Sequence, residues 1–334
     1  MTRICLITPA PPGSRNGNRA TAERWARLLQ HAGYPVSVRT DDPDLQADVL
    51  IALHAWRSAD QIRRWKASSS GPVILALTGT DVYHFQQIDP DIVHASMDAA
   101  DALIGLHGLI HRDVPERYHP RLHVVYQSAA LRRPHRPISS PWRVAVVGHL
   151  RDEKDPLRAA LAVRNLPVNS RIEVVQLGKA HTEDWAAAAR AEMARNPRYR
   201  WLGECDAHLT QWWMSTAQVM VISSVMEGGA NVVSEACVMG LPVIASRIPG
   251  NTGLLGEDYP ALFPPGDTDA LRQLLTRAES SPDFLEQLKL RCLDLAKRFT
   301  PAEEEAALCR VINRVLNPGD EPAPAHPPEA GPPR

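Results

Sequence analysis

Residues 223–246 of the chain read SSVMEGGANVVSEACVMGLPVIAS. A short apolar strand, Val219–Ile222, is predicted to end just before this stretch, and a helix is predicted to begin near Ala230. A second apolar run, Pro242–Ala245, follows the helix as another strand. Strand, loop, helix and strand in this order form the repeating unit of a parallel sheet covered by helices, so the stretch predicts an α/β fold.

The loop in this stretch has the composition of a ligand site. Glu227 lies at the carboxyl end of the strand, and the glycine pair that follows allows a ligand to approach the backbone closely. The next N–H groups open a helix N-terminus that suits a phosphate or a developing oxyanion; the residues concerned are Gly228, Gly229, Ala230 and Asn231. Glu235, on the same helix, is placed to accept hydrogen bonds from neutral hydroxyls such as a ribose diol. The alternative is that Glu227 only complements the helix dipole and Glu235 is solvated surface.

The same alternation of strands and helices fills both halves of the chain. We predict strands at residues 3–9, 35–39, 48–53, 73–77, 102–105 and 123–125, and again at 142–148, 172–177, 199–202, 219–222, 242–245 and 261–263. The proline-rich run Leu131–Pro141 is the predicted linker. The predicted organisation is two doubly wound, Rossmann-like domains, 1–135 and 136–317, that face each other across a cleft, and a proline-rich disordered tail, 318–334.

Composition narrows the class of partner. The chain of 334 residues has 37 basic and 38 acidic side chains and a pI near 6.9, so no overall field favours nucleic acid or an anionic membrane. Its five cysteines show no CxxC or Cys/His spacing, which indicates no zinc site or disulfide framework and fits a reducing cytoplasm. The first apolar run is too short for a signal peptide or a membrane span. We expect a cytoplasmic protein that acts on small molecules.

A resemblance to a known family follows from these residues. Glu227, seven residues, Glu235 and the turn MGLPVIAS resemble the E-x7-E signature of retaining GT-B glycosyltransferases of the glycogen-synthase-like superfamily, family 4. The segments SRIPGNTGLL and ALFPPGDTDAL resemble further motifs of that family, and the resemblance covers nearly all of the second domain. It implies the GT-B fold and a UDP-sugar donor. It also implies that Glu235 holds the ribose hydroxyls, that Glu227 contacts the transferred sugar, and that Gly228 to Asn231 lie against the sugar and diphosphate.

The segment VVGHLRDEKDP carries the positive charge that a leaving diphosphate needs. Lys154, six residues after Gly148, matches the lysine of the family, which implies a catalytic role. The family usually has arginine directly after that glycine, whereas this chain has His149, with Arg151 two residues further on. We favour Arg151 as the substitute because it stays charged at pH 7. Without the resemblance, residues 151–154 would be interpreted as a solvated charge run.

One further segment concerns the uracil base of the donor. Residues 199–203, YRWLG, lie where the family presents backbone groups to the uracil, so Trp201 and Leu202 are candidate donor-binding residues. Trp201 could equally belong to the core.

The first domain is implied to hold the acceptor, and three of its strand-end loops carry polar residues. The first has Asn16, Gly17, Asn18 and Arg19; the second has His54; and the third has Thr78, Gly79, Thr80 and Asp81. Residues 13–17 do not form a GxGxxG motif, so a dinucleotide is not expected there. A small polar or anionic acceptor fits better. His54 could instead be a satisfied structural histidine.

These loops, together with GHLRDEKDP, resemble a narrower subgroup of family 4, the selenosugar synthases of selenoneine biosynthesis. That resemblance implies transfer of GlcNAc or glucose from the UDP-sugar to selenophosphate, with a 1-seleno-sugar, UDP and phosphate as products. Arg19 and the N–H groups of TGTD would suit such an anion. No metal or other cofactor is expected. A small oxygen acceptor, a UDP-sugar epimerase or hydrolase, and a nucleotide-sugar sensor stay as alternatives.

Overall fold

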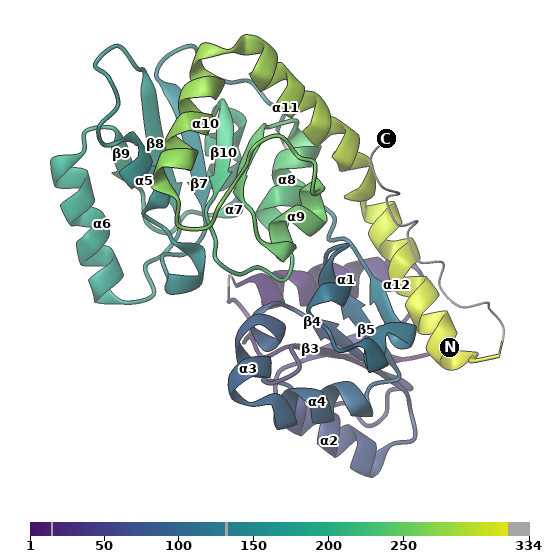
Figure 1. The fold of residues 1–334 in the computed structure, drawn as a ribbon. Helices are drawn as coiled ribbons and strands as arrows, with labels where there is room; N and C mark the ends of the chain where they lie inside the picture. The colour runs from purple at the N-terminus through teal and green to yellow at the C-terminus, as the bar shows by residue number, and fades with distance from the viewer. Residues whose placement is uncertain (15, 131–132, 320–334) are drawn as a thin grey trace.

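Two parallel sheets, each of six strands, form the framework of the chain in the computed structural model, which describes residues 1–14, 16–130 and 133–319. Each of the predicted strands is present, and its ends differ from the prediction by at most two residues. Leu131 and Arg132 of the predicted linker lie outside the described residues, as do residues 320–334 of the predicted tail. The α/β fold class with two doubly wound units is confirmed (Figure 1).

The first sheet has the strand order β2-β1-β3-β4-β5-β6. Its strands are β1 Ile4–Ile7, β2 Val36–Arg39, β3 Val49–Leu53, β4 Val73–Leu77, β5 Ala102–Gly105 and β6 Leu122–Val124. The helices of this half are α1 Gly17–His31, α2 Ala59–Ser68, α3 Gln86–Ile88 and α4 Pro90–Ala99, with a π-helix over Asp81–Phe85. Because β2 and β3 flank β1 on opposite sides, the sheet has its switch point at the carboxyl ends of β1 and β3.

The second sheet has the order β12-β11-β10-β7-β8-β9. Its strands are β7 Trp142–Val147, β8 Ile172–Leu177, β9 Tyr199–Trp201, β10 Val219–Ile222, β11 Val243–Ser246 and β12 Leu262–Phe263. The helices that follow the linker are α5 Arg158–Val163, α6 Glu183–Arg195, α7 Ala207–Ser215, α8 Asn231–Met239, α9 Pro249–Leu255, α10 Thr268–Ser280, α11 Pro282–Leu295 and α12 Pro301–Leu316. Here the switch point lies between β7 and β10, which are hydrogen-bonded neighbours.

Alternate residues of the first sheet enter two separate cores. Leu50 and Ala52 of β3 pack with Trp65 of α2 on one face. Val49 and Ile51 of the same strand pack with Trp25 of α1 on the other face. Strands buried on both faces explain why the sequence shows unbroken apolar runs rather than alternation.

Helix α12 returns to the first domain. Its buried residues Leu308, Val311 and Ile312 pack with Trp25 and Leu29 of α1 against the first sheet. Figure 1 shows α11 and α12 running along one side of the molecule from the second domain to the first. The predicted segment 136–317 therefore contains a helix that packs on the other domain, and the boundary at 135/136 itself stays a prediction.

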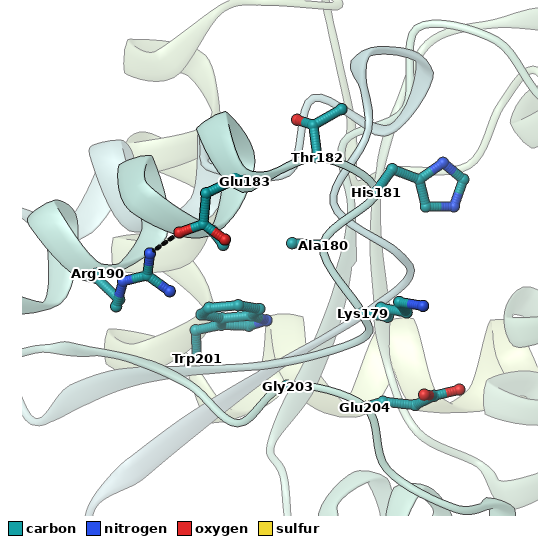
Figure 2. A pocket seen from close by; sticks show the side chains of 10 residues that line it. Lys179, Ala180, His181, Thr182, Glu183, Arg190, Trp201, Gly203 and Glu204 are labelled. Atoms are coloured by element: carbon teal, nitrogen blue, oxygen red, sulfur yellow. Dashed lines mark hydrogen bonds and ion pairs between the residues drawn. The ribbon is translucent and has the colours of Figure 1, made fainter.

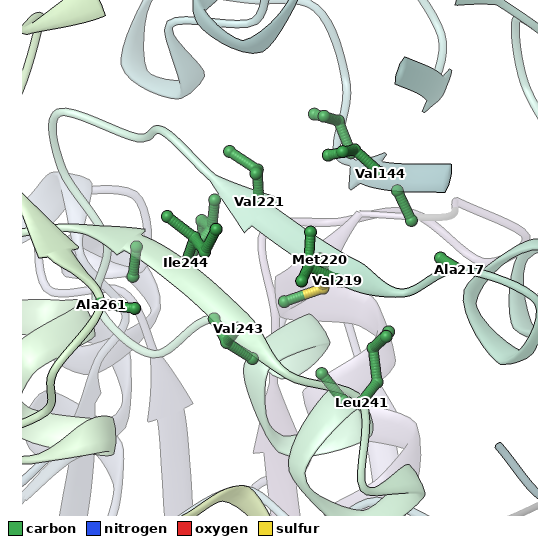
Figure 3. Packing of buried hydrophobic residues seen from close by; sticks show 14 of the residues in the cluster. Val144, Ala217, Val219, Met220, Val221, Leu241, Val243, Ile244 and Ala261 are labelled. Atoms are coloured by element: carbon green, nitrogen blue, oxygen red, sulfur yellow. The ribbon is translucent and has the colours of Figure 1, made fainter. Parts of the chain in front are cut away.

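The core of the second domain forms around β10 and β11, the strands that flank the signature stretch. Figure 3 shows Val219, Val221, Val243 and Ile244 in this cluster, all of which are buried. Within the described ranges, every helix is too short or too polar to cross a membrane.

Candidate active site

The loops after β7 and β10 meet at the switch point of the second sheet. Val219 and Val221 of β10 pair with Val144 and Val146 of β7, and both strands point to the same edge. Residues 148–154 after β7 therefore lie beside residues 223–230 after β10. The topology explains why two segments more than seventy positions apart share one site.

Lys154 and Glu227 form an ion pair at this edge. The Lys154 ammonium donates to Glu227 Oε1, and the Ser224 hydroxyl donates to the same oxygen at 2.6 Å. The Glu227 side chain is 8% exposed and that of Lys154 is 22% exposed. An ammonium suits a phosphate and a carboxylate suits a hydroxyl, so the pair combines the two kinds of group that the predicted donor requires.

The loop that carries Lys154 is fixed to the end of β10. Ser223 Oγ donates to the carbonyl oxygens of Lys154 and Asp155 at 3.1 and 2.9 Å, and Val225 N–H donates to Glu153 O at 2.9 Å. Asp155 reverses the chain with a φ of 42°, in the left-handed region. These contacts hold the Lys154 backbone, so its ammonium has a defined reach toward Glu227.

Helix α8 begins one residue after the predicted start. Ala230 is its N-cap residue, with extended backbone, and Asn231 is the first helical residue. The buried Ala230 and its neighbours therefore present the first N–H groups of α8 at the same edge as Lys154. Glu235 follows on α8 as a half-buried residue. The predicted donor-binding residues of this stretch are thus brought together, and their roles stay predictions.

Glycines of the second domain touch the first domain directly. A Cβ built on Gly228 would lie 2.2 Å from the Thr78 carbonyl carbon, and one on Gly79 would lie 2.6 Å from Gly228 N. A Cβ on Gly229 would lie 2.5 Å from Leu106 Cβ. The loop after Glu227 and the TGTD loop therefore meet backbone to backbone, at a distance that no side chain allows.

Buried residues of β11 and α9 contact the backbone of the loop that carries Glu227. Ser246 Oγ donates to Ser224 O at 2.5 Å and accepts from Asn251 Nδ2 at 3.0 Å. Gly250 of α9 lies so close that its Cβ would be 2.0 Å from Glu227 O. The backbone at Glu227 is therefore held by β11 and α9 as well as by its own strand.

His149 and Arg151 take different positions in the loop after β7. His149 Nδ1 accepts a hydrogen bond from Lys179 N–H at 3.1 Å, and its ring lies 5.5 Å from that of His181. Arg151 lies 3.8 Å from Glu153 and is 36% exposed. Lys154 is the member of this charge run that contacts Glu227, and Gly148 packs beside its side chain. That Arg151 replaces the arginine of the family stays a prediction.

A cavity of about 440 Å³ lies at the carboxyl ends of β8 and β9. Figure 2 shows the Trp201 ring in it, between the Glu183–Arg190 ion pair and Lys179. The Trp201 indole donates to Gly178 O at 2.8 Å, and Leu202 N–H donates to Gln176 O at 2.9 Å. Trp201 thus packs against the core and also lines the cavity, and its role in donor binding stays a prediction.

The TGTD loop is organised by its own aspartate. The fully buried Asp81 carboxylate accepts from the N–H groups of Thr78, Gly79 and Ala55 at 2.7 to 3.0 Å. Thr80 follows Gly79 and is the N-cap residue of the π-helix. The expectation that the N–H groups of TGTD hold an anion needs correction for Thr78 and Gly79, because a carboxylate of the protein already accepts from them.

His54 is a buried residue with an unusual backbone. Its φ is 77°, its side chain is 1% exposed, and its Nδ1 accepts from Arg57 N–H at 3.2 Å. Nε2 lies 2.9 Å from Thr80 Oγ1 and is therefore the protonated nitrogen, which donates. Burial lowers the pKa of His54, and Asp81 opposes that shift only in part. The geometry describes a neutral histidine that fixes Thr80.

The first loop becomes the start of α1 rather than a free loop. Asn16 is the N-cap residue, and its side chain accepts from Arg19 N–H at 2.9 Å, so Gly17, Asn18 and Arg19 form the first helical turn. The capping asparagine thus fixes the start of α1 at Gly17. The Arg19 guanidinium pairs with Glu23 at 2.7 Å and lines a cavity of about 360 Å³ beside β2.

His107 at the end of β5 was not predicted as a site residue. It is fully buried; its Nε2 lies 2.9 Å from the Tyr83 hydroxyl, which donates to Asp113 at 3.1 Å. Burial, with a smaller effect of His111, lowers its pKa to about 4. Gly253 of α9 packs against its ring across the domain boundary. The strand-end position that selected His54 would have selected His107 as well.

Residues 127–291 match the family model described as "Glycosyl transferases group 1". Sucrose-phosphate synthase from Thermosynechococcus elongatus is similar in structure, with a TM-score of 0.79 and 16% identity over 96% of this chain and 100% of that one. The structure of HepE of Anabaena in complex with UDP-glucose has a TM-score of 0.73 and 15% identity, over 94% of this chain and 100% of that one. The structure of a glycosyltransferase from Rickettsia africae has a TM-score of 0.73 and 12% identity, over 96% of this chain and 99% of that one. No curated protein matches the chain in sequence.

The match of residues 127–291 covers the signature stretch and the loop of Lys154. The similar structures cover both domains, at identities that establish the fold. The chain therefore has the GT-B fold, and the stretch of it that carries Lys154 and Glu227 matches the glycosyl transferases group 1 model.

Proposed function

We propose that this protein is a glycosyltransferase that moves GlcNAc or glucose from a UDP-sugar to selenophosphate. The single observation that carries the donor half is the Lys154–Glu227 pair beside the N-terminus of α8. A lysine and free N–H groups stabilise a leaving diphosphate, and a neighbouring carboxylate contacts sugar hydroxyls. The cavity beside Trp201, at the next strand ends, has the size for a nucleobase.

The transfer breaks the bond between the anomeric carbon and the β-phosphate oxygen and forms a bond from that carbon to selenium. UDP departs with the electron pair of the broken bond, and Lys154 and Arg151 balance its charge. Water then cleaves the selenium–phosphorus bond, which leaves a 1-seleno-sugar and phosphate. Because selenophosphate is already an anion, the chemistry needs no general base, which agrees with a buried and neutral His54. The proposal includes no metal ion.

Support for a small acceptor comes from the contact between the two domains. Gly228 and the TGTD loop meet backbone to backbone next to Glu227, which narrows the approach to the site from the first domain. A compact nucleophile passes such an approach more readily than a lipid or an oligosaccharide. Transfer to a small oxygen acceptor on the same donor site is the second candidate, since the same geometry favours it equally.

Mass spectrometry of the products tests the proposal. The protein is incubated with UDP-GlcNAc or UDP-glucose and with selenophosphate, thiophosphate or no acceptor, each with and without EDTA. We expect a hexose or hexosamine product with the isotope pattern of selenium, UDP release that depends on selenophosphate, and no effect of EDTA. Fast UDP release without an acceptor would indicate a hydrolase or an epimerase. UDP binding without turnover under any condition would indicate a sensor, and transfer to an added alcohol alone would favour the second candidate.

A further inference from the structure

A buried polar cluster joins the two domains beside the N-terminus of α8. Thr21 and Arg24 come from α1, Gln127 from the segment that leaves β6, and Gly229 and Asn231 from the start of α8. Gln127 and Thr21 are each 2% exposed. None of the residues from the first domain was predicted as a site residue, because none stands directly at the end of a strand.

The Gln127 amide has one orientation in which all of its groups are satisfied. Its nitrogen then donates to Gly229 O at 2.9 Å and to Asn231 Oδ1 at 3.1 Å, and its oxygen accepts from Thr21 Oγ1 at 2.6 Å and from the Arg24 guanidinium at 3.1 Å. The opposite orientation would place donors against donors and acceptors against acceptors. A buried amide mispaired in this way costs about 1–3 kcal/mol for each group, so the orientation is well determined.

Arg24 is itself held in place by α12. Its Nε donates to Glu304 at 2.8 Å, and Glu304, whose side chain is fully buried, also accepts from the Trp25 indole at 2.7 Å. The other end of the guanidinium donates to Asn231 Oδ1 at 3.0 Å. The return of α12 to the first domain thus fixes an arginine that reaches the first residue of α8.

The bond from Gln127 to Gly229 O decides which way one peptide faces. In a planar trans peptide the C=O and the following N–H point in opposite directions, so Ala230 N–H points away from Gln127 and the first domain. The contact is close, since a Cβ on Gly229 would lie 2.5 Å from Leu106 Cβ and 3.3 Å from the Gln127 amide. The peptide therefore cannot turn while the two domains stay in contact.

We propose that Gln127, oriented by Arg24, is a positioning residue that aims the Ala230 N–H at the leaving diphosphate. The anion-binding end of α8 is then complete only when the first domain lies against it, so domain closure and the stabilisation of the leaving group are one event. The inference rests on the proposed function, because it needs a phosphate leaving group at α8. Gln127 itself touches neither the diphosphate nor the sugar.

Gln127→Glu tests this proposal with little change in volume. The new carboxylate still accepts from Thr21 and Arg24, but it cannot donate to Gly229 O, and its second oxygen repels that carbonyl. We expect kcat for UDP release from the UDP-sugar to fall about tenfold or more, with KM for the donor changed less than about threefold. The ³¹P resonance of the β-phosphate of bound UDP should shift. The control is Gln30→Glu, the same chemical change at an exposed position of α1, which should match wild type.

The outcomes separate this inference from the proposed function. A Gln127→Glu protein with kcat within twofold of wild type and an unshifted ³¹P resonance would overturn the inference, even if its Tm had fallen. If that variant does not fold, Arg24→Lys takes its place, because lysine keeps the charge beside Glu304 but cannot reach both Gln127 and Asn231. A wild-type protein that releases UDP from no UDP-sugar would refute the proposed function, and with it the role given to Gln127.

Discussion

Glu227 and Asp81 are buried carboxylates that follow a central strand by a few residues, one in each domain. Glu227 follows β10, and its partners are two side chains, the Lys154 ammonium and the Ser224 hydroxyl. Asp81 follows β4, and its partners are backbone N–H groups of its own loop and of Ala55. The two carboxylates occupy matching places in the two doubly wound sheets, yet the partners of Glu227 are side chains and those of Asp81 are backbone groups.

The difference shows how a strand-end carboxylate is assigned to ligand or to fold. A lysine on a long flexible chain can leave Glu227 for a phosphate at a cost set by one ion pair. The N–H groups around Asp81 cannot leave it without unfolding the loop that includes Thr78 and Gly79. Variants of the two sites should therefore fail in different ways, the first in turnover and the second in stability.

Lys154→Met should have the largest effect on turnover. Methionine keeps most of the side-chain volume but removes the charge that balances the leaving diphosphate, so we expect kcat to fall about 10²- to 10³-fold. UDP release from the UDP-sugar measures the rate. The control is Lys289→Met on the exposed face of α11, where the lysine pairs with Glu286. A Lys154→Met protein with wild-type kcat would mean that another residue balances the charge of the leaving diphosphate, with Arg151 or His149 as the next candidates.

Gly228→Ala should have the next largest effect on turnover, because it disrupts the contact between the loop after β10 and the TGTD loop. The added methyl group would lie 2.2 Å from the Thr78 carbonyl carbon, so the domains must separate or the loop must move. We expect kcat/KM to fall about 100-fold with the Tm of each domain nearly kept. Gly319→Ala, beyond the end of α12, is the matched control, since a Cβ there meets nothing within 4 Å. Equal rates for both variants would contradict a closed active state.

Much of this fold was accessible from local patterns in the sequence. Strands such as Val73–Leu77 and Val219–Ile222 are unbroken apolar runs because both of their faces are buried, and the predicted bounds coincide with those of the structure. The predicted site residues Lys154 and Glu227 lie in strand-end loops, and parallel topology brings neighbouring strand ends to one edge. Sheet topology was enough to place these loops side by side, whereas Lys154 was selected from its charge run by the resemblance to the family.

The remaining features depend on which partner a group selects in space. The apolar face of α12 predicts that the helix packs, but it does not say that Leu308 and Val311 pack on the first sheet. Asp81 and Asn16 looked like ligand contacts because the sequence does not show that the N–H groups beside them are already donors to their side chains. An asparagine three residues before Arg19 is, however, a capping signal that sequence analysis could have used. No pattern in the sequence indicated a role for Gln127.

Asp81→Asn is expected to lower stability rather than donor binding. One oxygen of the carboxylate becomes an NH₂ group that faces backbone N–H donors, so we expect the free energy of unfolding to fall by about 2 kcal/mol. Urea unfolding measures this, and KM for the UDP-sugar should stay within twofold of wild type. Asp91→Asn, at an exposed position in the first turn of α4, serves as the control. A large rise in KM without loss of stability would make Asp81 a ligand contact after all.

The smallest effect expected is that of a single pH unit on stability, and it originates in the first domain. Burial lowers the pKa of His107 from its ordinary 6.5 to about 4, so the unfolded chain takes up a proton there that the folded chain refuses. The free energy of unfolding should therefore fall as the pH falls from about 6.5 to about 4, by up to about 1.4 kcal/mol per pH unit for this histidine. The half-buried His123, whose pKa burial also lowers to about 4, adds a slope of the same sign.

His107→Asn should flatten that slope while His123 keeps its own share. Urea unfolding at intervals between pH 4 and 7 gives the slope for the wild type, for this variant and for His31→Asn, a control at an exposed end of α1. The second domain has the switch-point site, but the histidines with pKa values near 4 lie in the first domain. Acid should therefore loosen the first domain, and with it the contact of Gly253 with His107. An unchanged slope in His107→Asn would mean that water reaches that ring in the folded protein.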